Sequence, residues 1–421
     1  MEGRSVTTSA NIDARAATYA VDSPYAWMRL ATSVLLSTIG GVGMWSFVVA
    51  LPAVQTEFAV DRAAASLPFT LTMIGFGIGG VLMGWLSDRF GLIVPVVLGG
   101  ISLALGYVLT GYATTLWQFT IAYGVLIGFG SSATLGPMMA DISHWFVRRR
   151  GIAVTICSSG NSLAGTVWPP IVQHFIAADG LRATQIGIGL FCAVTIVPIA
   201  LMMLRHRAPA LHAAQTAMLT TSTPASLGLS SGMLQGLLCV AGFACCVAMA
   251  MPQVHIVAYC GDLGYGIANG ADMLALMMAG SILSRVASGF VADRIGGLAT
   301  LMVSSALQGL ALMLYLMFSG LTSLYVISAL FGLFQGGLIP MYAMIIREYF
   351  APKEAGTRVG VVLLATLGGM ALGGWMSGLI FDLTGSYQAA FLNGLLWNLL
   401  NLAIAAWLMM RRDSGRRLVA A

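Results

Sequence analysis

Charged residues are scarce in this sequence. Asp, Glu, Lys and Arg make up 8% of its 421 residues, whereas soluble globular domains carry about 25%. So little charge excludes a chain that covers its surface with water-facing side chains. The hydrophobic residues, 58% of the total, gather in runs of about 20, the length of a membrane-spanning helix rather than of a barrel strand. The composition therefore predicts an all-α membrane protein.

Groups that carry catalytic chemistry are also missing. The sequence has no phosphate-binding glycine loop, no paired histidines and no nucleophile elbow. Its six cysteines lie within or beside apolar runs without metal-ligand spacing, which is typical of small buried side chains. We therefore expect no enzyme activity, no cofactor and no metal site.

Twelve apolar runs are long enough to cross a bilayer. We expect these spans at 29–55, 66–86, 92–111, 117–140, 151–177, 183–204, 232–257, 267–290, 298–318, 324–345, 356–380 and 387–410. The residues before the first run are polar and lack the apolar core and cleavage site of a signal peptide. They are predicted to form a cytoplasmic tail.

Basic residues are distributed unevenly among the connectors. Nineteen of the twenty are arginine, and seventeen fall on one side of the membrane if the N-terminus lies inside. Two, Arg62 and Arg182, fall outside, and Arg285 falls within a span. Because short loops rich in Lys and Arg stay in the cytoplasm, both termini are predicted to be cytoplasmic and the protein to lie in the inner (plasma) membrane. The positions of the arginines are explained by the orientation of the chain in the membrane, so they do not indicate a nucleic-acid-binding face.

The second half of the chain repeats the first. Gly84-Trp-Leu-Ser-Asp88-Arg89-Phe-Gly91 returns 205 residues later as Gly289-Phe-Val-Ala-Asp293-Arg294-Ile-Gly296. A parallel duplication of this kind places a substrate site near the midplane, between the halves. The expected parts are a cytoplasmic tail at 1–27, a six-helix bundle at 28–204, a cytoplasmic central loop at 205–231, a second six-helix bundle at 232–410 and a tail at 411–421.

The repeated Gly-x-x-x-Asp-Arg-x-Gly loop resembles the signature of the major facilitator superfamily, and the resemblance extends over the whole chain. It implies a secondary transporter of twelve helices in two six-helix halves that works as a monomer in the lipid bilayer. Gly84 would let two helices approach closely, and Gly91 would permit a tight turn. The charged motif residues are expected to hold a cytoplasmic gate; they are Asp88, Arg89, Asp293 and Arg294.

Three stretches are similar to the monocarboxylate porter branch of this superfamily, which includes the oxalate:formate antiporter. They are Trp45–Phe58, Pro252–Gly264 and Arg285–Asp293. The resemblance implies a small carboxylate as substrate and Arg285 as its binding residue. The eleventh span lacks the lysine that holds a second carboxylate in the oxalate carrier, which favours a monocarboxylate. Proton-coupling residues of the animal carriers are also replaced, by Ala53 and Ser281.

The position of Arg285 supports this role on physical grounds. It lies eight residues before Asp293, hence about 12 Å from the cytoplasmic end of its helix. A charge at that depth costs about 2.5 kcal/mol or more unless it faces water or a partner, and arginine does not lose its proton. Asp272, thirteen residues away on the same helix, is about 20 Å distant and cannot pair with it directly.

Other span residues have two interpretations each. His255 would bind substrate oxygen or respond to protonation, or it would be a buried structural hydrogen-bonding group. Aromatic and amide side chains would line a cavity for a short apolar anion, or simply pack between helices; they are Tyr123, Trp45, Phe331, Phe334 and Gln335. Asp141, near the cytoplasmic end of the fourth span, is interpreted as structural or gating.

The sequence therefore predicts a transporter of a small monocarboxylate, similar to lactate or pyruvate, that works by alternating access. Cotransported protons or a counter-anion would balance the substrate charge. Two alternatives remain: exchange of one carboxylate for another, and efflux of amphipathic drugs or metabolites.

Overall fold

The computed structural model describes residues 21–203 and 228–420, and these contain helices and no strand. The first half consists of α2 (Pro24–Gly40), α3 (Val42–Phe58), α4 (Arg62–Phe90), α5 (Ile93–Tyr112), α6 (Leu116–Ile121), the π-helix η1 (Ala122–Ile127), α7 (Gly128–Ser132), α8 (Gly136–Trp145) and α9 (Arg150–Met203). The second half consists of α11 (Ser231–Asp262), α12 (Ile267–Ile295), α13 (Gly297–Met317), α14 (Leu321–Gln335), α15 (Leu338–Tyr349), α16 (Pro352–Thr384) and α17 (Tyr387–Ala420).

The apolar runs form helices because lipid offers no hydrogen-bond partner to an unpaired backbone. In the described residues, 11 continuous helical segments are long and apolar enough to cross a membrane. The longest, α9, has 54 residues and is interrupted at Gly180, where φ is 82° and ψ is 170°. An unbroken helix of that length would extend about 80 Å, far more than the bilayer core of about 30 Å, so α9 crosses twice. The predicted all-α fold with twelve spans is confirmed.

The ends of the halves differ from the predicted boundaries. The first described helix begins at Pro24, within the predicted tail 1–27. The last described helix continues to Ala420, so that most of the predicted tail 411–421 is helical. Residues 1–20 of the first tail, the last residue of the first bundle (204) and 205–227 of the predicted central loop lie outside the described residues. Apolar composition locates a span well, but it does not show how far the helix continues beyond the bilayer.

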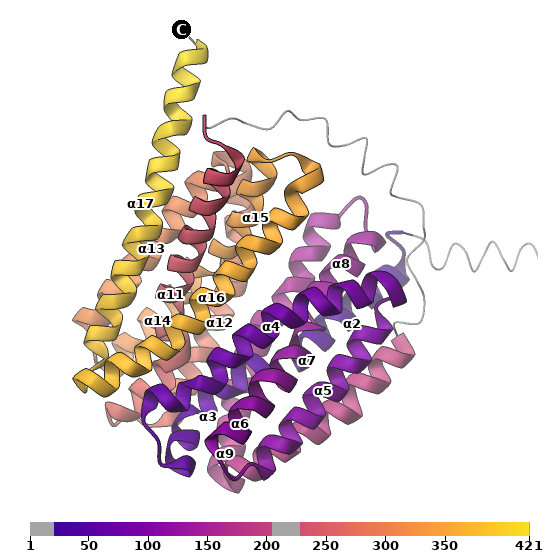
Figure 1. Ribbon diagram of the computed structural model, residues 1–421, viewed down its shortest axis with the longest axis vertical. Coiled ribbons are helices and arrows are strands. Elements are labelled where there is room, and N and C mark those ends of the chain that lie inside the picture. Colours follow the sequence, from indigo (N-terminus) through magenta and orange to yellow (C-terminus); the bar gives the residue numbers. More distant parts are fainter. Residues whose placement is uncertain (1–20, 204–227, 421) are drawn as a thin grey trace, which may run out of the picture.

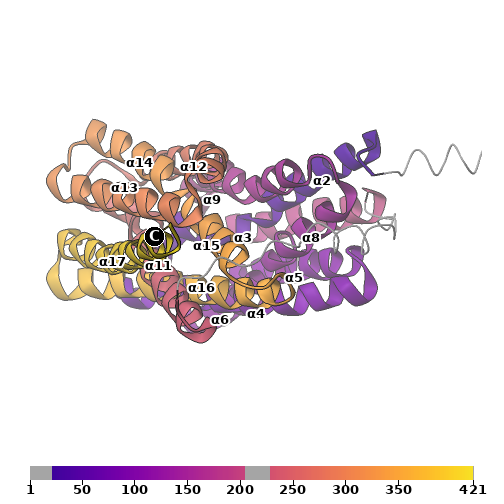
Figure 2. The same ribbon diagram turned by 90° about the horizontal axis from the view of Figure 1, so that it is seen from above.

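The two halves form separate bundles that meet mainly along four helices. Figure 2 shows the N-terminal bundle on one side and the C-terminal bundle on the other, with α4, α9, α12 and α16 between them. The duplication is visible in the packing: a Cβ at Gly128 would meet the backbone of Thr72, and a Cβ at Gly332 that of Met277. These pairs lie at equivalent positions of the two halves, so the repeat is one of structure as well as sequence.

Contacts between the halves gather at one end. A Cβ at Gly378 of α16 would lie 3.0 Å from the Arg62 carbonyl oxygen, and one at Gly374 would lie 2.9 Å from the Phe69 ring. Further along, Gly77 faces Leu364 and Leu367. Toward the C-terminus the two bundles splay apart (Figure 1). We call the joined end the closed end and the other, which carries Asp88 and Asp293, the motif end.

Close glycine packing predicts a stability effect. Gly332→Ala is expected to lower stability by about 1–3 kcal/mol, since overpacking displaces backbone or side chains. Its Cβ would lie 2.8 Å from the carbonyl carbon of Met277, which cannot move away as a flexible side chain would. The measurement is the thermal unfolding midpoint in detergent. Gly187→Ala is the control, because its Cβ would meet nothing within 4 Å; equal midpoints for the two variants would contradict the packing.

Candidate functional site

One face of α4 shows where the halves separate. Gly77 faces α16 of the other half, with its Cβ position 3.0 Å from Leu364. Gly80 and Gly84, three and seven residues later, lie on the same face, yet a Cβ at either position would meet nothing within 4 Å. The contact between the halves therefore ends just beyond Gly77.

The equivalent face of α12 carries Arg285. Met278 touches the N-terminal half, since a Cβ at Gly165 of α9 would lie 2.5 Å from its Cγ. Gly289, eleven residues later on the same face, has an open Cβ position with nothing within 4 Å. Arg285 lies between them, about 10 Å from Met278 along the helix, and is the counterpart of Gly80 in the repeat. It therefore lies where the two halves begin to separate.

The Arg285 side chain has no ion-pair partner among the described residues. It is half-buried, and its Nε is buried without a hydrogen-bond partner. Two other arginines are buried, and both are paired: Arg29 with Asp141 at 2.7 Å, and Arg62 with Asp262. A guanidinium stays charged in all ordinary conditions, and an unpaired charge at this depth is a typical sign of a binding site. The side chain is suited to hold an anion between the halves.

Trp45 flanks the same region. A Cβ at Gly165 would lie 3.0 Å from its ring atoms, on the contact that Met278 makes. The indole Nε1 donates a hydrogen bond to the Asn161 carbonyl at 3.0 Å, which fixes the ring. Trp45 therefore lies at the contact between the halves, about two turns of α12 from Arg285.

Gln335 lies at a break in the tenth span. It is the last residue of α14, and α15 begins at Leu338. A Cβ at the next residue, Gly336, would lie 2.8 Å from Ser281 Cα, one helical turn from Arg285. Gln335 is therefore close to the level of Arg285. Phe334 beside it is only partly buried and packs on the main apolar core.

Tyr123 and Phe331 lie inside their own halves. The Tyr123 hydroxyl lies 2.8 Å from Ser46 Oγ and donates to the Gly43 carbonyl at 3.1 Å. Phe331 is fully buried and packs edge-on against Tyr315, with ring centroids 6.1 Å apart. In this conformation neither side chain faces the region between the two halves, and their role as cavity liners stays a prediction.

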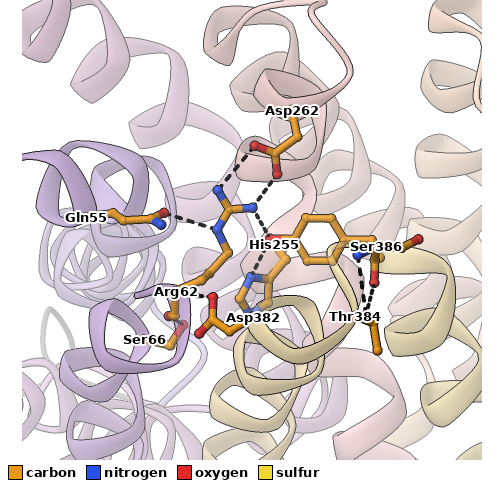
Figure 3. Close-up of polar contacts among 9 residues, drawn as sticks. Gln55, Arg62, Ser66, His255, Asp262, Asp382, Thr384 and Ser386 are labelled. Atoms are coloured by element: carbon orange, nitrogen blue, oxygen red, sulfur yellow. Dashed lines mark hydrogen bonds and ion pairs between the residues drawn. The ribbon is translucent and has the colours of Figure 1, made fainter. Parts of the chain in front are cut away.

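His255 belongs to the closed end in this conformation (Figure 3). It is fully buried, and its Nε2 lies 2.7 Å from the Gly374 carbonyl oxygen. A carbonyl only accepts, so Nε2 carries the proton and Nδ1 accepts from the Tyr387 hydroxyl, 3.1 Å away. Both ring nitrogens are thus occupied. The geometry favours the structural interpretation of His255 here, while substrate contact in another conformation stays a prediction.

Arg62 is the centre of the closed-end network. It reaches across the halves to Asp262 through both Nη atoms, with Nη2 3.2 Å from Oδ1. Its Nη1 also donates to the Tyr387 hydroxyl at 3.0 Å, and its Nε to Gln55 at 3.1 Å. Asp382 accepts from the backbone amides of Arg62 and Ala63 at 3.0 and 2.7 Å. One arginine therefore connects α3 and α4 with α11, α16 and α17.

This network is not among the predictions from the sequence, in which Arg62 is only an outer connector residue and Asp262 only part of the stretch Pro252–Gly264. The signal was present: Arg62 is one of two outer basic residues, and Asp262 and Asp382 lie near the ends of spans on the same side. Arg62 contacts Asp262, 200 positions away, and Asp382, 320 positions away. Patterns within short segments of sequence do not report such distant contacts.

The motif residues are not engaged at the motif end. The carboxylates of Asp88 and Asp293 are exposed and form no ion pair among the described residues. Arg89 stacks on Trp85 and Phe90 of its own helix. The predicted turn glycine is confirmed, because Gly91 has φ of 86°, as does Gly296 in the copy. A gating role for Gly84, Asp88, Arg89, Asp293 and Arg294 stays a prediction for a conformation in which this end is closed.

Asp141 holds the N-terminal half together at the motif end. Its oxygens accept from Arg29 Nε at 2.7 Å and Nη2 at 2.9 Å, a bidentate pair. The Arg29 guanidinium also lies 4.9 Å from the centroid of the buried Trp145 ring. This supports the structural interpretation of Asp141. Within residues 21–203 and 228–420, no three His, Cys, Asp or Glu side chains gather to hold a metal ion.

Comparison with known proteins gives a consistent result. The model of the major facilitator superfamily matches residues 34–321 and 236–421. Monocarboxylate transporter 13 of Rattus norvegicus is 27% identical over 387 residues, covering 88% of this chain and 86% of that protein. The agnestins efflux protein of Paecilomyces divaricatus is 23% identical over 311 residues, covering 73% and 70%.

Solved structures of low sequence identity share the fold. The nucleoside transporter NupG matches with a TM-score of 0.71 at 14% identity, covering 91% of this chain and 99% of its own. A bacterial homologue of the human lysosomal transporter Spinster matches with a TM-score of 0.65 at 15% identity, covering 93% and 96%. These likenesses concern the fold alone.

Proposed function

Because this chain belongs to the major facilitator superfamily, we propose that it transports a small monocarboxylate and binds its carboxylate at Arg285. The observation that carries the proposal is the unpaired Arg285 guanidinium at the point where the halves separate. A planar guanidinium binds a carboxylate through two parallel hydrogen bonds. The similarity to a protein named as a monocarboxylate transporter supports the same substrate class.

The charge balance supports one carboxylate rather than two. Arg29 and Arg62 are already paired with Asp141 and Asp262, so Arg285 offers its charge alone. A second carboxylate bound beside it would be a buried charge without a partner, which costs several kcal/mol. Protons or a counter-anion would compensate the charge that the substrate carries.

The arrangement of the halves supports alternating access as the mechanism. The Arg62 network joins them at the closed end, and the Gly84 and Gly289 faces are open at the motif end. The excess of arginine in the connectors favours the motif end as cytoplasmic, in the inner membrane and with both termini inside. The site would then be open to the cytoplasm, and rocking of the halves would expose it outside.

The proposal is tested in proteoliposomes that contain a pH-sensitive dye. Short monocarboxylates are added outside one at a time, with protein-free vesicles correcting for diffusion of the neutral acid and a dicarboxylate of similar length as a negative control. We expect protein-dependent acidification of the lumen for at least one monocarboxylate. For an exchanger, uptake would instead require a preloaded carboxylate. Failure of every acid in both assays would contradict the proposal and favour efflux of other metabolites.

A further inference from the structure

Two glutamines form a buried pair with unused hydrogen-bonding capacity. Gln253 of α11 donates from Nε2 to Oε1 of Gln335 at 3.0 Å, and the residues are 4% and 3% exposed. The other amide atoms, Gln253 Oε1 and Gln335 Nε2, are buried and have no hydrogen-bond partner. A buried polar atom left in this state costs about 1–3 kcal/mol. The pair therefore requires a further partner.

The chemistry of that partner does not depend on how the amides are oriented. As placed, the pair leaves one acceptor, on Gln253, and one donor, on Gln335. If both amides were turned over, the donor would be on Gln253 and the acceptor on Gln335. In either case the free atoms are one N–H donor and one carbonyl acceptor. A single hydroxyl group satisfies both, because it accepts one hydrogen bond and donates another.

The pair lies close to the proposed carboxylate site. Gln335 ends α14 at the break in the tenth span, and broken helices in transporters commonly form substrate sites. The residue after it packs on Ser281, with its Cβ position 2.8 Å from the Ser281 Cα. Arg285 is one turn further along α12, about 6 Å. Gln335 therefore lies about one helical turn from the level at which Arg285 would hold a carboxylate, and a short acid would meet the amides if its carbons extend toward the break in the tenth span.

We propose that Gln253 and Gln335 select monocarboxylates that carry a hydroxyl group within a few bonds of the carboxylate. This inference rests on the proposed function. An unsubstituted acid leaves both amide atoms unsatisfied. The oxo group of an oxo acid accepts a hydrogen bond from the N–H donor. It has no hydrogen to donate, so the amide carbonyl stays unsatisfied. Sites that hydrogen-bond a substrate hydroxyl discriminate strongly against analogues that lack it.

The test compares initial uptake rates of four radiolabelled acids in proteoliposomes. They are propanoate, 2-hydroxypropanoate, 3-hydroxypropanoate and 2-oxopropanoate, each corrected with protein-free vesicles. Wild type is expected to transport at least one hydroxy acid about tenfold or more faster than propanoate and 2-oxopropanoate. The double variant Gln253→Met/Gln335→Met is expected to reduce that ratio to near one, because uptake of the hydroxy acid falls more than uptake of the other acids.

Double replacement keeps the experiment free of a folding artefact. Methionine has a similar shape, and replacing both partners removes the unsatisfied atoms, so stability is expected to be unchanged or higher. Gln308→Met is the matched control, because Gln308 is also fully buried but faces Cys245 within the same half. It is expected to keep the wild-type ratio, and its thermal midpoint measures the cost of losing a structural amide.

The outcomes separate the inference from the proposed function. Transport of monocarboxylates without preference for a hydroxyl would overturn the inference alone. A preference that survives in the double variant would assign selectivity to other residues and leave the amides as a structural, water-bridged pair. Failure of wild type with every acid would overturn the proposed function and this inference with it.

Discussion

Arg285→Gln is expected to reduce carboxylate transport by about 100-fold, with protein abundance and fold retained. Removing one partner of a buried charge pair costs about 2–5 kcal/mol, and 2.7 kcal/mol corresponds to a factor of about 100. Since Arg285 has no ion-pair partner in the described part of the chain, its loss leaves no protein carboxylate unpaired. The loss should therefore appear in substrate affinity, measured as concentration-dependent uptake in proteoliposomes, and not in the thermal midpoint.

Two further variants test whether the loss of transport is specific to the Arg285 guanidinium. Arg285→Lys retains the charge but loses the planar fork, so an intermediate affinity is expected. Arg358→Gln in the same half removes a partly buried arginine that pairs with the exposed Glu354, and its transport should equal wild type. If Arg285→Gln transported carboxylates as well as wild type does, Arg285 would not be the binding residue. Efflux of uncharged amphipathic compounds would then be the better hypothesis.

Arg62→Ala is expected to open the closed end. It removes the ion pair with Asp262 and the hydrogen bonds to Tyr387 and Gln55. Asp262 is 36% exposed, so solvent screens part of the interaction. We expect a shift of about 1–3 kcal/mol in the equilibrium between conformations, or roughly 5–150-fold in their ratio.

The shift is measured by electron-spin distances between labels at Thr56 and Gln388, exposed residues at the closed end of opposite halves. In Arg62→Ala the population at longer distance should increase. Arg182→Ala is the matched control, because this exposed arginine pairs with Glu57 inside the N-terminal half at 2.8 Å. It should leave the distances unchanged. Identical distributions in all three proteins would show that the Arg62 network does not hold the halves together.

The fold was predictable because its signals are local. A run of apolar residues must become a helix in lipid, and a loop such as Gly84–Gly91 recurs unchanged in spacing. The repeat also has a physical counterpart, since α4 and α12 each have 29 residues. Helix ends were less predictable, because α17 continues to Ala420 beyond the apolar run.

The candidate site was predictable only in part. Arg285 was found from sequence because a charge within an apolar run is itself a signal. His255, Tyr123 and Phe331 carry no such signal. In the structure His255 joins the closed end and the other two pack inside their halves. An aromatic or histidine side chain on a helix can face a neighbouring helix of its own half or the region between the halves. The rotation of the helix about its axis decides which of the two it faces.

By itself the sequence determined the class of the protein, its twelve spans, its duplication and the one basic residue placed within a span. It did so because hydropathy, charge and spacing are properties of short segments. Tertiary structure alone decided that Arg62 pairs with Asp262, that Gln253 meets Gln335 and that the halves separate at Arg285. These features join helices far apart in the chain, so they depend on how the helices pack.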